Sequence, residues 1–421
     1  MTRSTLSLLF TLLFILTLSA AERVPERHWP RWRGPSDSGS SSKGSYLASW
    51  SDSENVLWKV SLPGIGTSTP TVWGDQVFLT CPAEGQDCVL CYDWSGKKLW
   101  QTSVGKELAG KHRNGSGSNP SAVTDGLQVF SYFKSGTLSA LGMDGRLNWS
   151  VNLQQKYGNN KLYWDLGTSP VISDKLVIVA AMHGGDSYVV ALEKQGGEVA
   201  WKIERNYETP VEGDHSYATP ILLREGKRET LLVWGAERLT AYNAADGSLL
   251  WSCSGFNPDA RGNWVAVASF VVAGDMVVVP YGRGAHIAGI QLGGKGDVTD
   301  THRAWTLENK GSFVPTPATD GTNVYVLRDS GQVLCIDAAS GETRWEGNFP
   351  NHRSKYYASP VIADGKIYAP REDGVLLVAS ITDGFKLLSE NNMQQRLIAS
   401  PVPVGNRLLI RGERDLFCIG K

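Results

Sequence analysis

Two stretches decide the fold: residues 335–345 read CIDAASGETRW, and residues 241–251 read AYNAADGSLLW. Each contains an alternating apolar strand, a turn around a glycine, and a tryptophan four residues after that glycine. The spacing recurs in Gly96–Trp100, Gly145–Trp149 and Gly197–Trp201. Self-similarity at a fixed period is the signature of a repeat architecture, so we interpret the chain as a set of repeated units.

The beginning of each unit also recurs, as a small or hydroxyl residue followed by a proline and an alternating strand. The eight starts centre on Pro70, Pro120, Pro170, Pro220, Phe270, Pro317, Pro360 and Pro401. The first five are spaced by 50 residues, and the later gaps shrink to 47, 43 and 41. Each unit therefore has room for about four short strands with their turns.

The last unit is incomplete at its C-terminal end. It stops at ERDLFCIGK, before a glycine turn and tryptophan, while NVLWKVSL with Trp58 stands alone near the other end. Trp305 ends the fifth unit after a degenerate turn, and we expect Leu388 in the tryptophan position of the seventh. These features predict an all-β, eight-bladed β-propeller spanning residues 54–421, with its last blade closed by the N-terminal strand. A solenoid is the alternative, but the exchanged end strand favours a closed ring.

The N-terminus is typical of export. Residues 1–21 contain Arg3, an apolar run over residues 8–18 and small residues before Glu22, which predicts a signal peptide cleaved there. A retained membrane anchor is the alternative, which the short apolar run disfavours. No cysteine follows the run, so no lipoprotein anchor is expected. We expect residues 22–53 to be extended and the mature chain to be soluble, periplasmic or secreted, and without a transmembrane segment.

Charge argues against nucleic acid as a partner. The 41 basic and 42 acidic residues give a formal net charge of −1. Proteins that bind DNA or RNA usually carry a basic excess or stripe, and none is present here.

The six cysteines fall into two groups. Cys91, Cys335 and Cys418 share the repeat position held elsewhere by alanine, and Cys253 takes a core position, so all four are expected to be buried and inert. Cys81 and Cys88 flank the turn PAEGQD and are expected to form a disulfide in an oxidising compartment. Cys88 and Cys91 have CxxC spacing, but residues three apart on a strand face opposite sides, which argues against a metal or redox pair.

The loops before the innermost strands should rim one mouth of the central channel. They carry the residues that we propose as a binding surface: His112, Arg113, Asn114, Trp164, Asp165, Asp214, His215, Tyr217, Asn263, Trp264, Arg353, Lys355 and Tyr356. Polar and aromatic groups that converge in a concavity are the default signature of a binding site. The alternative is that these loops are merely polar and that their aromatic residues pack between blades. Basic residues outnumber acidic ones in these loops, which favours an anionic ligand or partner segment.

The two quoted stretches resemble the tryptophan motif of quinoprotein dehydrogenase propellers, which are built from pyrroloquinoline-quinone-type repeats. The same motif occurs in the family of the outer-membrane assembly lipoprotein BamB. The resemblance covers nearly all of residues 54–421. The opening HWPRWRGPSDSG, residues 28–39, resembles the first segment of exported bacterial proteins with such repeats, which are common in planctomycetes.

This resemblance implies a fold more firmly than a function, because propellers host unrelated activities. We favour a non-catalytic platform that binds an envelope protein, peptide or glycan and needs no cofactor or metal. The alternative is a dehydrogenase that uses pyrroloquinoline quinone and calcium. Members of that enzyme family carry adjacent cysteines, a calcium set of Glu, Asn and Asp, and a catalytic Asp, whereas this chain has no Cys-Cys pair. A hydrolase or lyase using His112 and His215 has no motif to support it, so no catalytic residue is predicted.

Overall fold

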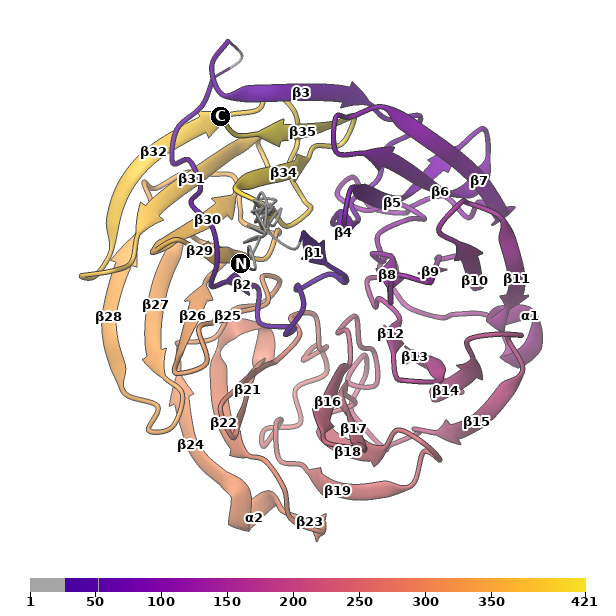
Figure 1. The fold of residues 1–421 in the computed structure, drawn as a ribbon. Helices are drawn as coiled ribbons and strands as arrows, with labels where there is room; N and C mark the ends of the chain where they lie inside the picture. Colours follow the sequence, from indigo (N-terminus) through magenta and orange to yellow (C-terminus); the bar gives the residue numbers. More distant parts are fainter. Residues whose placement is uncertain (1–26, 52) are drawn as a thin grey trace, which may run out of the picture.

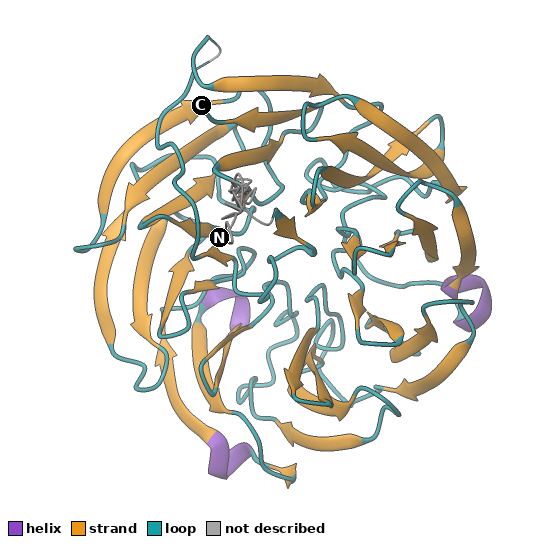
Figure 2. Cartoon of the chain, viewed as in Figure 1, coloured by secondary structure: helices purple, strands orange, loops and turns teal. Residues whose placement is uncertain are grey.

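The computed structural model describes residues 27–51 and 53–421. The predicted signal peptide and its cleavage site lie outside the described residues. Eight β-sheets surround a central axis, and strands dominate the described chain (Figures 1 and 2). The prediction of an all-β, eight-bladed propeller is confirmed. No helix in these ranges is long and apolar enough to cross a membrane.

The first four blades follow the chain in order. Blade 1 contains β4 (Thr71–Trp73), β5 (Gln76–Ala83), β6 (Gln86–Asp93) and β7 (Lys98–Lys106), with β1 (His28–Trp29) at its inner edge. Blade 2 contains β8 (Val123–Thr124), β9 (Gln128–Tyr132), β10 (Thr137–Gly142) and β11 (Leu147–Asn152), followed by helix α1 (Leu153–Tyr157). Blade 3 contains β12 (Val171–Ile172), β13 (Leu176–Ala181), β14 (Tyr188–Glu193) and β15 (Val199–Glu204). Blade 4 contains β16 (Ile221–Glu225), β17 (Arg228–Gly235), β18 (Arg238–Asn243) and β19 (Leu249–Cys253), with β23 (Gly296–Asp297) at its outer edge.

The remaining blades include the degenerate units and the closing blade. Blade 5 contains β20 (Val271–Ala273), β21 (Met276–Tyr281), β22 (His286–Gln291) and β24 (Arg303–Glu308), with the short helices η1 (Gly282–Gly284) and α2 (Thr299–His302) in its connections. Blade 6 contains β25 (Ala318–Thr319), β26 (Asn323–Leu327), β27 (Gln332–Asp337) and β28 (Thr343–Asn348). Blade 7 contains β29 (Val361–Ala363), β30 (Lys366–Pro370), β31 (Val375–Ser380) and β32 (Lys386–Asn392), with β2 (Ser40–Ser41) at its inner edge. Blade 8 contains β33 (Val402–Val404), β34 (Arg407–Arg411), β35 (Asp415–Ile419) and the N-terminal strand β3 (Val56–Ser61).

Blade 8 closes the ring with strands from both ends of the chain. Strand β3 pairs antiparallel with β35, and Trp58 lies opposite Cys418 in the register. Figure 1 shows the indigo β3 beside the yellow β35. The exchanged strand removes two free sheet edges, which would otherwise be open to pairing with other chains.

The tryptophan motif joins five of the blades to the next one through an indole hydrogen bond. The Nε1 atom of Trp100 in blade 1 donates a 3.0 Å hydrogen bond to the carbonyl of Met143 in blade 2. The indole lies on Gly145, where an added Cβ would stand 2.5 Å from the ring and where φ is 85°. Only glycine accepts both conditions. The same hydrogen bond, from an indole N–H to a backbone carbonyl of the next blade, is formed by Trp58, Trp149, Trp201 and Trp305.

The register explains the cysteines. The residue paired with each motif tryptophan is small, and Cys91, Cys335 and Cys418 occupy this position together with Ala140, Ala191 and Ala241. All six cysteines are buried free thiols in the structure. Cys81 and Cys88 are directly opposed partners of the β5–β6 hairpin, and a disulfide between them stays a prediction.

Two details of the expected repeat are wrong. Ser121, and not Asn119, takes the hydroxyl position of blade 2, so the unit starts two residues later than the Pro120 pattern indicates. In blade 7, Ser389 pairs with Val378 where a tryptophan pairs elsewhere, while Leu388 lies in the adjacent bulge. The turn there is one residue longer than in the other blades, which moves Leu388 out of the tryptophan position.

The segment before the propeller crosses the ring. Residues 27–51, here called the floor segment, add β1 to blade 1 and β2 to blade 7 (Figure 1). Between these strands, the carbonyl of Pro30 accepts a bond from Thr124 in blade 2, and that of Ser38 accepts one from Thr319 in blade 6. The floor segment also contacts the turns between the first and second strands, at Gly74 and Asp364. Those turns lie at the end of the blades opposite the loops that precede the first strands, so the segment covers the far end of the channel.

Candidate functional site

A ring of hydroxyl groups surrounds the channel at the start of the innermost strands. This hydroxyl ring consists of Thr69, Ser121, Ser169, Thr219, Ser269, Thr316, Ser359 and Ser400. In blades 1 to 6, the backbone N–H at this position donates to the hydroxyl of the next blade, at 2.8–3.0 Å, and Ser400 of blade 8 donates to Thr69 at 3.2 Å. The recurring Ser or Thr of the sequence therefore links blades around the axis.

Above this ring lies a central pocket of about 540 Å³. Its base is formed by six of the ring hydroxyls together with Trp32 of the floor segment. Its walls come from the loops that precede the first strands and include His112, Asn114, Trp164, Asp165 and Tyr217 from our predicted set. Trp32 closes the base, so this pocket opens toward the loop mouth.

Asp165 holds one of the mouth loops in place. Its carboxylate accepts hydrogen bonds from Lys134 Nζ at 2.7 Å and from the backbone N–H groups of Lys111 and His112 at 2.8 and 3.0 Å. Both acidic and basic side chains of the Lys134–Asp165 pair are nearly excluded from solvent. The carboxylate is thus engaged by the protein, and its role is to anchor residues 107–118, here called the crossing loop.

The crossing loop spans the mouth from blade 2 toward blades 7 and 8. Arg113 forms an ion pair with Glu372 at 3.3 Å, and Asn114 donates to the same carboxylate at 3.0 Å. Arg396 donates to the backbone carbonyl of Arg113. Arg113 lies before blade 2 and Glu372 belongs to blade 7, and the Arg113 side chain remains 66% exposed. Pairs of this exposure contribute little to stability, so the crossing loop is held more firmly at Asp165 than at its tip.

An aromatic cluster stands at the next blade. The N–H of Trp164 donates to the Tyr217 hydroxyl at 2.9 Å, which fixes the backbone of the loop. The ring of Trp164 meets those of His112 and Tyr163 edge-on, with centroids 5.2 and 4.8 Å away. Burial raises the pKa of Tyr217, so its phenol stays neutral. Tyr163 and Trp164 are 59% and 45% exposed, which leaves aromatic surface free at the mouth.

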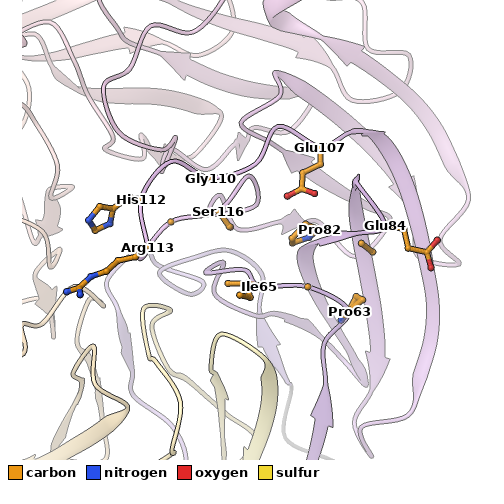
Figure 3. A pocket seen from close by; sticks show the side chains of 12 residues that line it. Pro63, Ile65, Pro82, Glu84, Glu107, Gly110, His112, Arg113 and Ser116 are labelled. Carbon is orange, nitrogen blue, oxygen red and sulfur yellow. The ribbon is translucent and has the colours of Figure 1, made fainter.

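A second pocket of about 470 Å³ lies beside the crossing loop (Figure 3). It is lined by Pro63, Ile65, Pro82, Glu84, Glu107, His112, Arg113 and Ser116 with neighbouring small residues. Figure 3 shows Glu107 and Glu84 at one side of this pocket, and His112 and Arg113 at the other. The crossing loop therefore separates two concavities of the same mouth.

The other predicted residues do not line the central pocket. His215 is buried with Asp214 3.8 Å away, and Trp264 packs its ring on His286 and Tyr281 of blade 5. Asn263, Arg353 and Lys355 are exposed around the rim. Tyr356 is buried against Phe349 in the core between blades 6 and 7, at a centroid distance of 5.7 Å. Its neighbour Tyr357 lines the pocket instead, because successive residues of an extended chain point to opposite sides.

Sequence reasoning missed two contributors to the pocket that lie outside the loops preceding the first strands. Trp32 belongs to the floor segment, whose path through the ring has no local sequence signal. Arg283 comes from the turn between the second and third strands, has φ of 55°, and places its guanidinium 4.1 Å from the centroid of Phe313. Turns of this kind also supply Glu372 and Glu413, which pair with Arg113 and Arg396. They were not counted in the predicted mouth, so the basic excess is partly neutralised.

The dehydrogenase alternative calls for a calcium set of Glu, Asn and Asp, so the surroundings of the mouth carboxylates are relevant to it. Within residues 27–51 and 53–421, no group of three or more His, Cys, Asp or Glu side chains is placed to hold a metal ion. Asp165 is occupied by Lys134 and backbone donors, and Asp214 faces His215.

Comparison with known families fits this architecture. The sequence model of the family "Outer membrane protein assembly factor BamB" matches residues 85–279 and 294–415. The chain belongs to this family. It is 22% identical over 365 residues to the BamB of Bordetella pertussis, covering 85% of this chain and 74% of that protein. It is 21% identical over 381 residues to the BamB of Yersinia pestis, covering 85% and 86%.

Solved structures of two kinds of protein superpose on this chain. The crystal structure of BamB from Moraxella catarrhalis superposes with a TM-score of 0.62 at 17% identity, covering 87% of this chain and 97% of that one. The quinohemoprotein alcohol dehydrogenase of Comamonas testosteroni superposes with a TM-score of 0.67 at 12% identity, covering 94% and 81%. At these identities the structural likeness establishes the fold, which BamB and the quinoprotein enzymes share.

Proposed function

We propose that this BamB-family chain is a non-catalytic binding platform of the bacterial envelope, and that its loop-lined mouth captures a partner protein. A peptide or glycan is the other class of ligand that a mouth of this kind could take. The membership of the family supports an assembly role, since the relatives are named for outer membrane protein assembly. The proposal places the mature chain in the periplasm or outside the cell, and it requires no cofactor.

One observation carries the proposal: apolar side chains are exposed on the mouth loops of four consecutive blades. They are Ile65, Leu108, Tyr163, Trp164 and Val211, with exposed fractions from 45% to 79%. Exposed apolar groups gathered in one place mark interaction sites more often than isolated ones do. Large aromatic residues dominate binding energy at such surfaces. The rigid ring holds these loops in one arrangement, which reduces the entropy cost of binding.

The dehydrogenase alternative has less support. Its solved representatives are 11–14% identical to this chain, which supports a common fold only. The chain has no adjacent cysteines, and Asp165 at the mouth is engaged by Lys134 and by backbone donors. We derive no reaction step for it.

The test is affinity capture from an envelope extract with the mature protein as bait. Replacing Trp164 by alanine should reduce partner capture by tenfold or more, because an exposed aromatic anchor is lost. Its melting temperature should hardly change, since exposed loop substitutions are usually within about 0.5 kcal/mol. Leu127→Ala is the matched control: Leu127 is 78% exposed, but it lies in the β8–β9 turn at the opposite end of the blade.

Two results would overturn the platform proposal. Equal loss of capture in both variants would mean that the mouth is not the binding surface. A rise in melting temperature with pyrroloquinoline quinone plus calcium, together with dye-linked alcohol oxidation, would establish the enzyme instead.

A further inference from the structure

A small cavity lies beneath Trp32, below the central pocket. Its volume is about 10 Å³, close to the space that one water-sized particle needs. On one side it is bounded by Arg31, Trp32, Arg33 and Asp37 of the floor segment, and on the other by the first strands of blades 3 to 5. It is separate from the mouth, and the inference drawn from it does not depend on the proposed function.

The groups around this cavity are rich in hydrogen-bond donors. Arg33 is 3% exposed, and its Nε and Nη1 atoms have no acceptor among the described residues. Arg31 Nε is likewise buried without a partner. The hydroxyls of Thr219 and Ser269 each accept a backbone N–H bond, and neither donates its own proton to a described protein acceptor. Buried donors of this kind need an acceptor, because leaving them unpaired is costly.

The local charge is also unbalanced. Asp37 pairs with Arg31 at 3.1 Å. Arg33 bonds to the carbonyls of Pro317 and Pro360 at 3.0 and 2.9 Å, and no carboxylate in the described chain forms an ion pair with it. Two guanidinium groups and one carboxylate leave one positive charge, and it resides on Arg33, which is almost fully buried. Burial lowers the pKa of Arg33 to about 9 and raises that of Asp37, as expected where charge is poorly compensated.

Arg224 is the other cation that faces Asp37 from a neighbouring element, and it is paired with Glu229 at 3.1 Å. This pair adds no net charge. The positive excess at the cavity therefore remains that of Arg33.

We propose that this cavity binds a single small monovalent anion of the halide class, which fixes the floor segment to blades 3 to 5. An anion accepts hydrogen bonds from the donors that line the cavity and neutralises Arg33. A water molecule accepts at most two hydrogen bonds and leaves the charge of Arg33 uncompensated. A cation would add to the positive excess. Sulfate and phosphate are larger than the space.

The first experiment compares thermal unfolding in sodium chloride and in sodium gluconate at equal ionic strength. A ligand that binds only the folded state raises stability as its concentration passes the dissociation constant. The wild-type melting temperature should rise by a few degrees with chloride, and gluconate, which is too large for the cavity, should give no such rise.

Arg33→Met should lose the chloride response. The matched control is Arg205→Met: Arg205 is equally buried, but its nitrogens bond to Thr240, the carbonyls of Gly235 and Arg238, and Met182. The control should melt at a lower temperature in both salts and keep the chloride response.

Bromide-soaked crystals of the wild-type protein provide a direct measurement that does not require either variant to fold. An anomalous peak next to Arg33 supports the proposal. Density of a water molecule without an anomalous peak, or equal melting in the two salts, overturns it.

Discussion

The two ends of the central channel are built in opposite ways. At the floor, residues 27–51 join the ring through backbone pairing and buried side chains, as in β1 with β4 and β2 with β29. At the mouth, the crossing loop reaches the far blades through exposed side-chain pairs such as Arg113 and Glu372. Backbone pairing in a dry interior is costly to break, whereas exposed ion pairs are worth about 0–1 kcal/mol. The floor segment is therefore held more firmly than the tip of the crossing loop.

The largest effect should come from opening the ring itself. Deleting Leu416–Lys421 removes most of β35, which leaves β3 and β34 without their partner. We expect the deletion to abolish cooperative unfolding and to disrupt the structure at both ends of the channel. Calorimetry and circular dichroism provide the measurements. Deleting Lys421 alone is the control and should unfold like the wild type. Cooperative melting of the longer deletion at the wild-type temperature would contradict ring closure.

The second prediction compares how much a tryptophan at the floor and one at the mouth contribute to stability. Trp29 is 1% exposed and packs on Gly34, so Trp29→Ala should cost about 3–5 kcal/mol, as large-to-small changes in a core do. Trp164→Ala at the mouth should cost less than about 0.5 kcal/mol. Denaturant unfolding of the two variants provides the measurement. Similar losses at both positions would mean that the two ends are equally important to the fold.

The fold could be predicted because its determinants are local and repeated. The glycine and tryptophan of CIDAASGETRW lie within one unit, and their partners in the next unit have the same sequence pattern. The site could be predicted only in part. His112, Asn114, Trp164, Asp165 and Tyr217 do line the pocket, because the loops that precede the first strands must rim the channel in any propeller.

What the sequence did not reveal depends on long-range contacts. The floor segment has no period, and its path through the ring is set by partners as distant as Pro317 and Pro360. Tyr356 and Tyr357 are neighbours of the same type, and only the packing of Phe349 decides which one enters the core. The role of Asp165 as an anchor follows from Lys134, which lies in another turn.

The third effect concerns the hairpin that borders the mouth. Cys81 and Cys88 are opposed in the β5–β6 hairpin, and Pro82, Ala83 and Glu84 between them line the smaller pocket. In protein from an oxidising compartment we expect a disulfide, worth about 2–3 kcal/mol for so short a loop. Alkylation after unfolding should label four cysteines without reductant and six with it. Six labelled cysteines in both samples would contradict the disulfide, and a Cys81→Ser, Cys88→Ser double variant should show no response of its melting temperature to reductant.

The last effect distinguishes two aspartates, one near each end. Burial raises the pKa of Asp87 to about 7, with its Oδ1 unpaired and Ser135 donating to Oδ2 at 2.6 Å. The folded state therefore holds a proton that the unfolded chain releases near pH 4. This contribution to stability is fully present below pH 4 and is lost as pH rises through about 7.

Asp125, in a turn at the floor end, has the opposite behaviour. Burial alone would raise its pKa, but hydrogen bonds from Lys194 and from the backbone N–H groups of Gln128 and Leu127 hold it below the ordinary value. Its contribution is present above pH 4 and is lost as pH falls through the folded pKa. The measurement is the free energy of unfolding from pH 3 to pH 8. Asp87→Asn should remove a decrease in this free energy as the pH rises, and Asp125→Asn should remove an increase in it over the acid range. If both variants changed the pH dependence of stability in the same direction, the two aspartates would not have the opposite electrostatic environments described here.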